Sequence, residues 1–403
     1  MEREDGIIVG DEQLKSYITD YYKGLFGPSE DNTISLQENL TDDIPQVSSA
    51  ENDILISPFS EQEIREAVFQ MEHNKAPGPD GFPAEFYQVF WEVIKKDLLA
   101  LFSDFYEEKL LLFCLNFGVI SLIPKTNDAK KIHQYRPICV LNVSFKIFTK
   151  VGTNRINKVV QSVIQPSQTA FIPGRNIMEG VVILHETIHE LHTKKLNRVI
   201  FKVDFEKAYD KVKWHFIQQT LRMKEFSPKW CRWVENFISG GSVSIKINDD
   251  IGHYFQTKKG IRQGDPLSPV LFNIVADMLA LLIKRAKNDG QIKGIIPHHV
   301  EDGLSIIQYA DDTILFMDHD IEQAKNLKLL LSMFEQLSGL KINFHKSELF
   351  CYGEAKGLED QYAEIFGCKI RDYPFCYLGI PMHHKKNSVI VIGKLLKKDL
   401  NGS

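Results

Sequence analysis

The sequence predicts an α/β or α+β fold in which a sheet carries helices on one face. Three short apolar, β-branched runs, each ended by a polar residue or a proline, are typical of strands: 119–124, 198–204 and 305–310. Helical apolar spacing separates and follows these runs. A length of 403 residues with 43% hydrophobic and 25% charged residues suits two or three folded modules and excludes a collagen-like or wholly disordered chain.

Apolar spacing and capping patterns predict the helices in chain order. The second of them begins with a capping box of Ser60 and Glu63, and the prolines and glycines of 74–83 end it. Turn residues at 248–250 between two alternating segments, 242–247 and 251–257, predict a hairpin. The expected helices are 13–26, 60–72, one from Ala84, 145–163, 180–192, 215–224, 269–287 and 321–337.

Charge is distributed unevenly along the chain. The whole sequence carries −5, but residues 1–60 carry −10 and the remainder carries +5. The polar, acidic segment 28–50 is typical of a linker or mobile loop. Residues 121–176 hold nine bases against one acid, and they form either a solvated face or a surface that contacts phosphates. The bases are Lys125, Lys130, Lys131, Arg136, Lys146, Lys150, Arg155, Lys158 and Arg175.

Cysteine spacing and the amino terminus indicate the compartment. The six cysteines form no CxxC pair and have no partnered histidines, which is typical of a reducing, intracellular protein. The first residues lack a signal-peptide pattern, and the longest apolar run, 110–123, is interrupted by Asn116. We therefore expect no membrane span.

Three aspartates stand at the ends of apolar strands. Asp204 ends the 198–204 run, and Asp311 and Asp312 occupy a turn between two strands. An Asp pair is also an ordinary turn sequence, but Asp204 in the matching position favours a cation that compensates the repulsion between the acids. Oxygen-only ligands favour hard divalent ions, which act in pairs about 3.5–4 Å apart in phosphoryl transfer. We expect two Mg²⁺ ions here, for which Mn²⁺ can substitute.

The aspartates lie in blocks that resemble a known family. KVDFEKAYD (202–210), GIRQGDPLSP (260–269) and YADD (309–312) resemble motifs A, B and C of reverse transcriptases. Six further blocks resemble the LINE-type, non-LTR retrotransposon enzymes of plants: NKAPGPDGFPAEFY, SLIPK, YRPI, QTAFIPGRNI, SGLKINFHKS and YLGIP. The resemblance runs from Lys75 to Pro381, and nine blocks in one order are far more specific than YADD alone.

The resemblance implies a role for each matched residue. The metal ligands would be Asp204, Asp311, Asp312 and the backbone carbonyl of Phe205. Tyr209 would exclude a ribose 2′-hydroxyl, although it is also read as an ordinary core tyrosine. The incoming nucleotide would contact Lys125, Arg136, Phe205, Tyr209, Gln263 and Gly264. Template or primer would contact Gly78, Gly81, Arg262, Tyr309, Tyr377 and Gly379.

The resemblance also implies a right-hand polymerase of fingers and palm, with a ferredoxin-like palm sheet and a thumb largely absent. The expected division is an acidic linker-like segment 1–55, fingers 56–195, palm 196–382 and a basic tail 383–403. The expected function is RNA-directed DNA synthesis on an RNA template from a DNA primer and deoxynucleoside triphosphates, in the nucleus and without a membrane. Two alternatives stay open: an inactive retrotransposon remnant that only binds nucleic acid, and a group II intron maturase-like protein.

Overall fold

The computed structural model describes residues 1–3, 6–28, 34–248, 250–298, 300 and 302–383. The chain divides into two compact units that interleave along the sequence. The first unit combines Met1–Val163, Lys207–Val275 and Leu337–Gly339, and the second combines Ile164–Glu206, Ala276–Gln336 and the chain from Leu340 onward. The predicted division at residue 195 stays a prediction, and most of the predicted basic tail, 384–403, lies outside the described residues.

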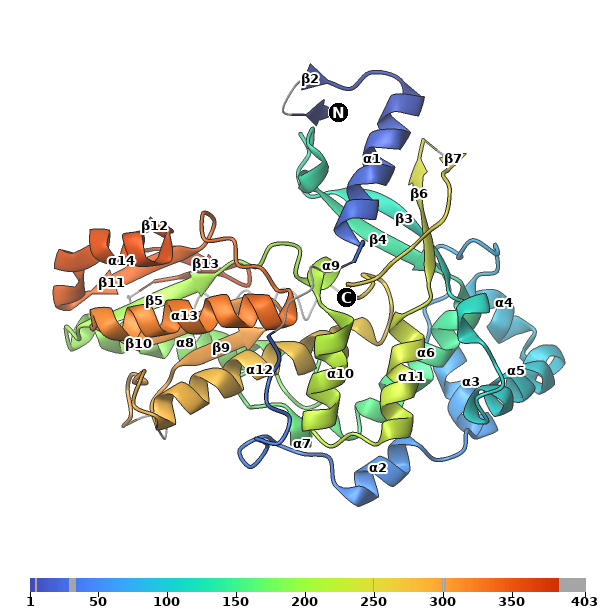
Figure 1. Cartoon of the computed structure of the whole chain (residues 1–403), viewed down its shortest axis with the longest axis horizontal. Coiled ribbons are helices and arrows are strands. Elements are labelled where there is room, and N and C mark those ends of the chain that lie inside the picture. Colours follow the sequence, from blue (N-terminus) through green and yellow to red (C-terminus); the bar gives the residue numbers. More distant parts are fainter. Residues whose placement is uncertain (4–5, 29–33, 249, 299, 301, 384–403) are drawn as a thin grey trace, which may run out of the picture. The chain divides into compact units, whose positions relative to one another are not determined.

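A five-stranded sheet forms the centre of the second unit (Figure 1). Its strands, in spatial order, are β12 (Lys369–Ile370), β11 (Glu348–Tyr352), β5 (Arg198–Val203), β10 (Asp312–Asp318) and β9 (Ile306–Tyr309). β5 pairs antiparallel with both β10 and β11, and the hairpin β9–β10 closes one edge. The predicted strands at 198–204 and 305–310 are therefore confirmed.

Helices cover both faces of this sheet, whereas the sequence predicted helices on one face. Ile200 shares a buried cluster with Leu184 and Ile188 of α8 (Ile177–Thr193). The next residue, Phe201, points to the opposite face, where its ring lies 4.6 Å from Phe366 of α14 (Glu359–Phe366). The unit also contains α13 (Ile321–Ser338) and a hairpin of β13 (Phe375–Tyr377) and β14 (Ile380–Met382), and α12 (Ser268–Asn288) enters it from the first unit.

The first unit is built around a second sheet and a group of helices. Its sheet order is β4 (Tyr135–Leu141), β3 (Phe117–Pro124), β6 (Ser242–Ile247) and β7 (Asp250–Ile251), and β8 (Phe255–Gln256) also pairs with β6. The remaining elements are β1 (Glu2–Arg3), β2 (Gly6–Ile7), α1 (Asp11–Leu25), α2 (Ser49–Leu55), α3 (Glu61–Phe69), α4 (Ala84–Val89), α5 (Trp91–Tyr106), α6 (Val143–Ile156), α7 (Val160–Val163), α9 (Ala208–Lys211), α10 (Trp214–Met223) and α11 (Pro228–Ile238), with short 3-10 turns at Leu112–Cys114 and Ile132–Gln134.

Rings from distant helices pack together in this unit. Phe102 and Phe148 stack with centroids 4.0 Å apart, and Trp233 stacks on Phe59 at 5.1 Å. Trp230 and Trp233 are fully buried. The predicted helix 145–163 is two helices, α6 and α7, and the second strand of the predicted hairpin is divided into β7 and β8.

The amino-terminal region is more ordered than its acidic composition indicates. Ile18 and Tyr22 of α1 are buried, and so are Ile44 and Val47 in the segment expected to be a linker. α2 begins with a complete capping box between Ser48 and Glu51, a pattern that the sequence analysis did not use. At α3, Ser60 does cap the helix, but the Glu63 side chain is paired with Arg155.

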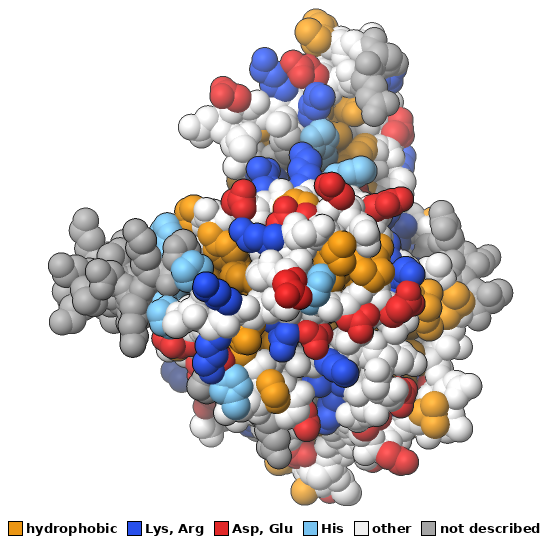
Figure 2. Space-filling model, turned by 90° about the vertical axis from the view of Figure 1, so that its left-hand side faces the viewer, with side chains coloured by type: hydrophobic (Ala, Val, Ile, Leu, Met, Phe, Trp, Pro, Cys, Tyr) orange, Lys and Arg blue, Asp and Glu red, His pale blue; other side chains and the backbone are white. Residues whose placement is uncertain are grey.

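The basic stretch 121–176 is not one surface. Lys125, Lys130, Lys131, Arg136 and Lys158 are exposed, but Arg155 is 2% exposed and Arg175 donates hydrogen bonds to backbone carbonyls of 164–168. On the face shown in Figure 2, basic side chains of described residues alternate with acidic and apolar ones. Helices in the described part of the chain are too short or too polar to cross a membrane, and all six cysteines are free thiols.

Candidate functional site

Two of the predicted aspartates lie side by side at one end of the second unit's sheet. Thr313 of β10 pairs with Val203 of β5, so the next position places Asp312 opposite Asp204. Tyr309 pairs with Asp312 across the β9–β10 hairpin, which puts Tyr309, Asp312 and Asp204 in one row on one face. Asp311 lies in the two-residue turn beside them. The structure therefore brings Asp204 beside Asp311 and Asp312, which lie more than 100 residues later in the sequence.

The carboxylates in this row are close enough to affect one another. Loss of solvation raises the pKa of Asp312, and the negative charges of Asp311 and Asp204 raise it further. Lys202, on the same face of β5, opposes this shift. All three aspartates are nevertheless exposed residues, so a ligand can reach them from solvent.

A turn from a later block holds Asp204 in place. The Asp204 amide donates to Ser347 Oγ at 3.0 Å, and the Asn343 amide donates to the Asp204 carbonyl at 2.7 Å. Ser347 in turn donates to the Asn343 carbonyl at 2.9 Å. The SGLKINFHKS block thus positions Asp204 through its backbone and Ser347, and this contact could not be predicted from the sequence.

This turn also sets the direction of the Phe205 carbonyl, the predicted backbone metal ligand. Phe205 forms an isolated antiparallel bridge with Ile342. The two hydrogen bonds of this bridge are made by the residues on either side of Phe205, not by Phe205 itself. The Asp204 carbonyl accepts one, and the Glu206 amide donates the other to Lys341 at 2.8 Å. The Phe205 carbonyl therefore faces away from the 341–347 turn.

A buried glutamine fixes the turn that carries Asp311. Gln168 is fully buried, and its Oε1 accepts from the Ala310 amide at 2.9 Å while its Nε2 donates to the Ala310 carbonyl at 3.3 Å. Ala310 has a positive φ of 51°, a conformation that needs such support in a residue with a Cβ. Sequence reasoning missed Gln168, although it lies in the QTAFIPGRNI block.

Two further residues with predicted roles in nucleic-acid contact lie in the β13–β14 hairpin of this unit. Tyr377 is 1% exposed, so its ring packs in the core. Gly379 lies in the turn with φ 76°, beside Leu378 with φ 50°. The glycine is needed there because consecutive residues with positive φ form this tight turn.

The predicted triphosphate ligands lie in the first unit, on the β3–β4 hairpin. Arg136 pairs with Ile123, and the Lys125 amide donates to the Gln134 carbonyl at 2.8 Å. Residues 123, 125 and 136 therefore share one face of the hairpin. Both basic side chains are exposed, and Lys125 is close enough to Asp210 to lower its pKa.

The loop 260–265 lies between β8 and α12 in the chain and forms hydrogen bonds with α9 and with β4. Its Ile261 amide donates to the Tyr209 carbonyl at 2.8 Å, and the Cys139 amide donates to the Gln263 carbonyl at 2.8 Å. A Cβ at Gly264 would lie 2.7 Å from the Cys139 carbonyl oxygen, so glycine is required for this approach. Gln263 and Gly264 are thus placed beside the β3–β4 hairpin that carries Lys125 and Arg136.

Arg262 is turned away from the nucleic-acid contact predicted for it. Its guanidinium packs 5.4 Å from the Phe145 ring and donates to Asn116, and a Cβ on Gly241 would collide with it. Burial lowers its pKa. The side chain contributes to the interior of the first unit in this structure.

Tyr209 and the APGPDG turn complete the predicted set. The Tyr209 ring stacks on Phe272 with centroids 4.7 Å apart and an interplanar angle of 11°, and the residue is partly exposed. Gly78 approaches Asn142 so closely that a Cβ would lie 2.4 Å from its amide nitrogen. Gly81 has φ 77° and open space around it.

Asp210 is an acid that sequence reasoning did not single out. It is 2% exposed and accepts a hydrogen bond from Gln263 Nε2 at 3.2 Å. Burial raises its pKa to about 6, although Lys207, Gln263, Lys125 and Lys211 stabilise the carboxylate. The only sequence feature that could have pointed to Asp210 is its position at the end of the KVDFEKAYD block.

The raised pKa predicts how stability depends on pH. Because the folded-state pKa lies above the ordinary value of 3.8, ionising Asp210 costs the folded state free energy, and the stability of the first unit should fall between about pH 4 and pH 6. In Asp210→Asn, the part of this decrease in stability that comes from ionising Asp210 should be absent. Urea unfolding followed by tryptophan fluorescence at several pH values measures this, because all four tryptophans lie in the first unit. If the free energy of unfolding changed equally with pH in wild type and Asp210→Asn, the prediction would be wrong.

Comparison with known proteins agrees with this arrangement of strands and aspartates. The reverse transcriptase (RNA-dependent DNA polymerase) family matches residues 123–382, which is most of the chain. The chain belongs to this family. The predicted right-hand fold of fingers and palm, with its α+β class, is thereby confirmed for this chain.

Relatives of this chain are proteins of mobile elements. The Transposon TX1 uncharacterized 149 kDa protein of Xenopus laevis is 28% identical over 88% of this chain and 26% of its own length. The Pol polyprotein of the type-2 retrotransposable element R2DM of Drosophila melanogaster is 27% identical over 72% of this chain and 26% of its own. The chain thus spans about a quarter of these relatives, which support the predicted non-LTR assignment.

A solved structure is also similar to this chain. Apo telomerase from Candida tropicalis, truncated from its C-terminal domain, aligns with a TM-score of 0.44 at 15% identity over 83% of this chain and 82% of its own.

Reverse transcriptases depend on divalent metal ions, and the aspartate row suits one. Its donors are all oxygens, and the mutual repulsion at Asp312 is what a cation would relieve. Among the described residues, no three His, Cys, Asp or Glu side chains are already grouped tightly enough to hold a metal. We therefore expect the carboxylates to close on the ion as it binds.

Proposed function

We propose that this domain is the RNA-directed DNA polymerase of a non-LTR, LINE-type retrotransposon. It would add deoxynucleotides to the 3′-hydroxyl of a DNA primer on an RNA template. The observation that carries the proposal is the row of Asp204 and Asp312 with Asp311 beside them, at a sheet end in a reverse transcriptase fold.

The aspartates would bind two Mg²⁺ ions together with the Phe205 carbonyl. These ions would stabilise the attacking and leaving oxygens of nucleotidyl transfer. Asp204 is held by the 341–347 turn and Asp311 by Gln168, so the chain fixes the backbone of the ligands before metal arrives. Tyr309, in the same row, would then contact the primer end.

Other residues would bind the nucleotide and the strands. Arg136 suits a bidentate phosphate contact and Lys125 a point contact, and both lie on one exposed face. Gln263 and Gly264 would contact the nucleotide from the neighbouring loop. Gly78 and Gly81 would contact template, and the 377–379 turn would lie along the primer. Arg262 would take part only if it left its site beside Phe145.

The source and location of the protein belong to the same proposal. The nine blocks resemble plant elements, and a retrotransposon polymerase acts in the nucleus. An inactive remnant that only binds nucleic acid is the second candidate. Intact aspartates held by hydrogen bonds favour the enzyme over the remnant, and the APGPDG block favours the LINE type over the maturase type.

Primer extension tests the proposal. Purified protein is incubated with poly(rA), oligo(dT), dTTP and Mg²⁺, and product length is read on a gel. Extension that requires both template and Mg²⁺ supports the enzyme. Binding to the same primer–template without any extension, in Mg²⁺ or Mn²⁺, would instead favour the remnant.

Tyr209 gives a test of sugar selection. Tyr209→Ala would open space beside Phe272 for a 2′-hydroxyl and should raise ribonucleotide relative to deoxynucleotide incorporation by about tenfold or more. Tyr209→Phe keeps the ring and should leave the ratio unchanged. The measurement is the ratio of kcat/KM for UTP and dTTP. An equal loss of both substrates in the alanine variant would identify Tyr209 as a packing residue.

A further inference from the structure

Phe171, in the segment that leads into α8, is an exposed aromatic residue in a left-handed backbone conformation. Its φ is 52°, and 54% of the residue is exposed. A bulky side chain is rare at positive φ, because its Cβ crowds the carbonyl oxygen that follows. An exposed ring also contributes little hydrophobic stabilisation. Neither feature stabilises the fold, and such backbone strain is typical of residues that contact a ligand.

Hydrogen bonds on both sides of Phe171 hold this conformation. The Ala170 amide donates to Gln168 Oε1 at 3.1 Å, and the Arg175 guanidinium donates to three backbone carbonyls of the preceding segment at 2.6 and 2.7 Å. The same Gln168 oxygen accepts from the Ala310 amide, in the turn between β9 and β10, at 2.9 Å. One buried side chain therefore fixes both the Phe171 loop and the turn that carries a predicted metal ligand.

The Phe171 ring lies beside Tyr309, at one end of the aspartate row. The two ring centroids are 6.2 Å apart, with an interplanar angle of 41°. Tyr309 pairs with Asp312, and directly opposed residues of neighbouring strands are about 5 Å apart, so the Phe171 ring is on the order of 10 Å from Asp312. Bases of a DNA strand follow one another at about 3.4 Å along the helix axis. Phe171 is therefore within reach of about the last two or three nucleotides of a strand that ends at the aspartates.

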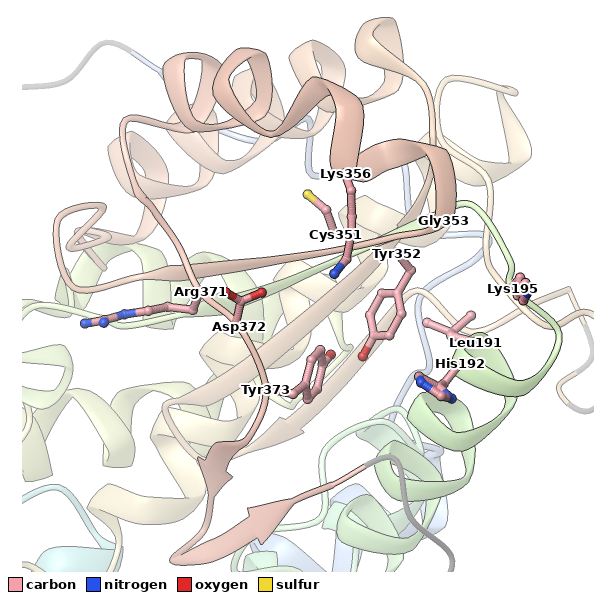
Figure 3. Close-up of a pocket in the computed structure, with 10 residues that line it drawn as sticks. All are labelled: Leu191, His192, Lys195, Cys351, Tyr352, Gly353, Lys356, Arg371, Asp372 and Tyr373. Atoms are coloured by element: carbon pink, nitrogen blue, oxygen red, sulfur yellow. The ribbon is translucent and has the colours of Figure 1, made fainter.

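The pocket lined by Tyr352 and Tyr373 lies at the opposite end of the same sheet (Figure 3). Tyr352 pairs with Arg198 at the start of β5, whereas Asp204 follows the end of that strand, so the two places are about 20 Å apart along it. A strand that ends at the aspartates would therefore be contacted by side chains around the row, and the Phe171 ring is among them.

Given the proposed polymerase function, on which this assignment rests, we propose that Phe171 contacts the primer strand and holds its last nucleotides in place. The primer is the strand whose end must lie at the metal ions, and Phe171 lies beside the tyrosine proposed for that end. An aromatic ring packs against a base or sugar without reading the sequence. The contact would bury the exposed ring, and the fixed loop would keep it in place before the primer binds.

Photochemical cross-linking tests this contact without catalysis. 5-Iododeoxyuridine, which cross-links to neighbouring aromatic side chains, replaces a thymidine at each of the last three positions of a DNA primer in turn, and 5-iodouridine replaces a uridine at matching positions of its RNA template. The duplex is irradiated with the protein in the absence of Mg²⁺ and nucleotides. Trypsin should release peptide 159–175, in which Phe171 is the only aromatic residue, cross-linked to the primer. A cross-link from the template alone, or none to this peptide, would overturn the proposal.

Phe171→Ala should raise the KM for primer–template about tenfold, because base–aromatic contacts are lost, and should leave the KM for dTTP unchanged. Phe171→Tyr keeps the ring and should restore the wild-type value. Leu329→Ala is the matched control, since it also shortens an exposed apolar side chain of the second unit, on α13. The affinities are also measured by fluorescence anisotropy without Mg²⁺. Equal affinity of Phe171→Ala and Leu329→Ala for primer–template would contradict the assignment.

Phe171→Asn separates a binding role from a packing role. Asparagine tolerates the left-handed conformation better than phenylalanine, so this variant should melt at the wild-type temperature or above it, while its affinity for primer falls as in Phe171→Ala. A lower melting temperature together with weaker binding would instead identify Phe171 as a packing residue. A protein that gives the cross-link but extends no primer would contradict only the polymerase function. Normal extension without the cross-link would contradict only the role of Phe171.

Discussion

Asp312→Asn should reduce primer extension by about a thousandfold or more, because it removes a charged oxygen ligand from the metal site without changing side-chain volume. Asp312 lies beside Asp204 on the neighbouring strand, and the negative charges of Asp204 and Asp311 raise its pKa. No other described acid in its row can replace it. The measurement is single-nucleotide incorporation on poly(rA)–oligo(dT).

The same variant should be at least as stable as wild type without metal. The pKa of Asp312 is raised, so ionising it costs the folded state free energy as pH rises above 3.8. The amide has no such cost. Added Mg²⁺ should raise the melting temperature of wild type, because it binds the folded state, and should raise that of Asp312→Asn less.

Asp360→Asn is the matched control, since Asp360 is an exposed acid in the first turn of α14. It should extend primers at the wild-type rate. Two results would contradict the assignment of the metal ligands. One is normal extension by Asp312→Asn. The other is an Mg²⁺-dependent rise in melting temperature that is equal in wild type and Asp312→Asn.

Arg155→Met should destabilise the first unit by about 3–5 kcal/mol, because it leaves the largely buried Glu63 carboxylate without a counterion and two backbone carbonyls without a donor. Arg155 is 2% exposed and binds both oxygens of Glu63, at 2.6 and 2.8 Å. It also donates to the carbonyls of Leu55 and Ser57 at 2.8 and 2.7 Å. One side chain thus ties α3 and the segment before it to α6.

Arg222→Met provides the comparison. Arg222 also donates two hydrogen bonds to one carboxylate, that of Glu38, at 3.0 and 2.6 Å, but this pair is 48% and 41% exposed. Its loss should cost less than about 1 kcal/mol. Urea unfolding by tryptophan fluorescence reports on the first unit alone. Equal costs for the two variants would show that burial does not decide the strength of these pairs.

Local sequence was enough to predict the two strands that carry the aspartates and the kind of ligand that the aspartates would bind. The runs 198–204 and 305–310 are apolar and β-branched, and such runs form buried strands in most contexts. An acid directly after such a run is expected at the strand end, where its side chain reaches solvent, and Asp204 and Asp311 both lie there. The order of the nine blocks was also sufficient to recognise the reverse transcriptase family.

Tertiary structure decided which of the charged residues are available to a ligand. The sequence predicts a nucleic-acid contact for Arg262 and places Arg155 in a solvated or phosphate-contacting stretch. In the structure, Arg155 pairs with Glu63 and Arg262 packs against Phe145, and both partners are distant along the chain. Sequence periodicity cannot show this, because burial of an arginine depends on partners that only the fold supplies. In the same way, the Gln168 support of Ala310 arises from segments that meet only in the folded chain.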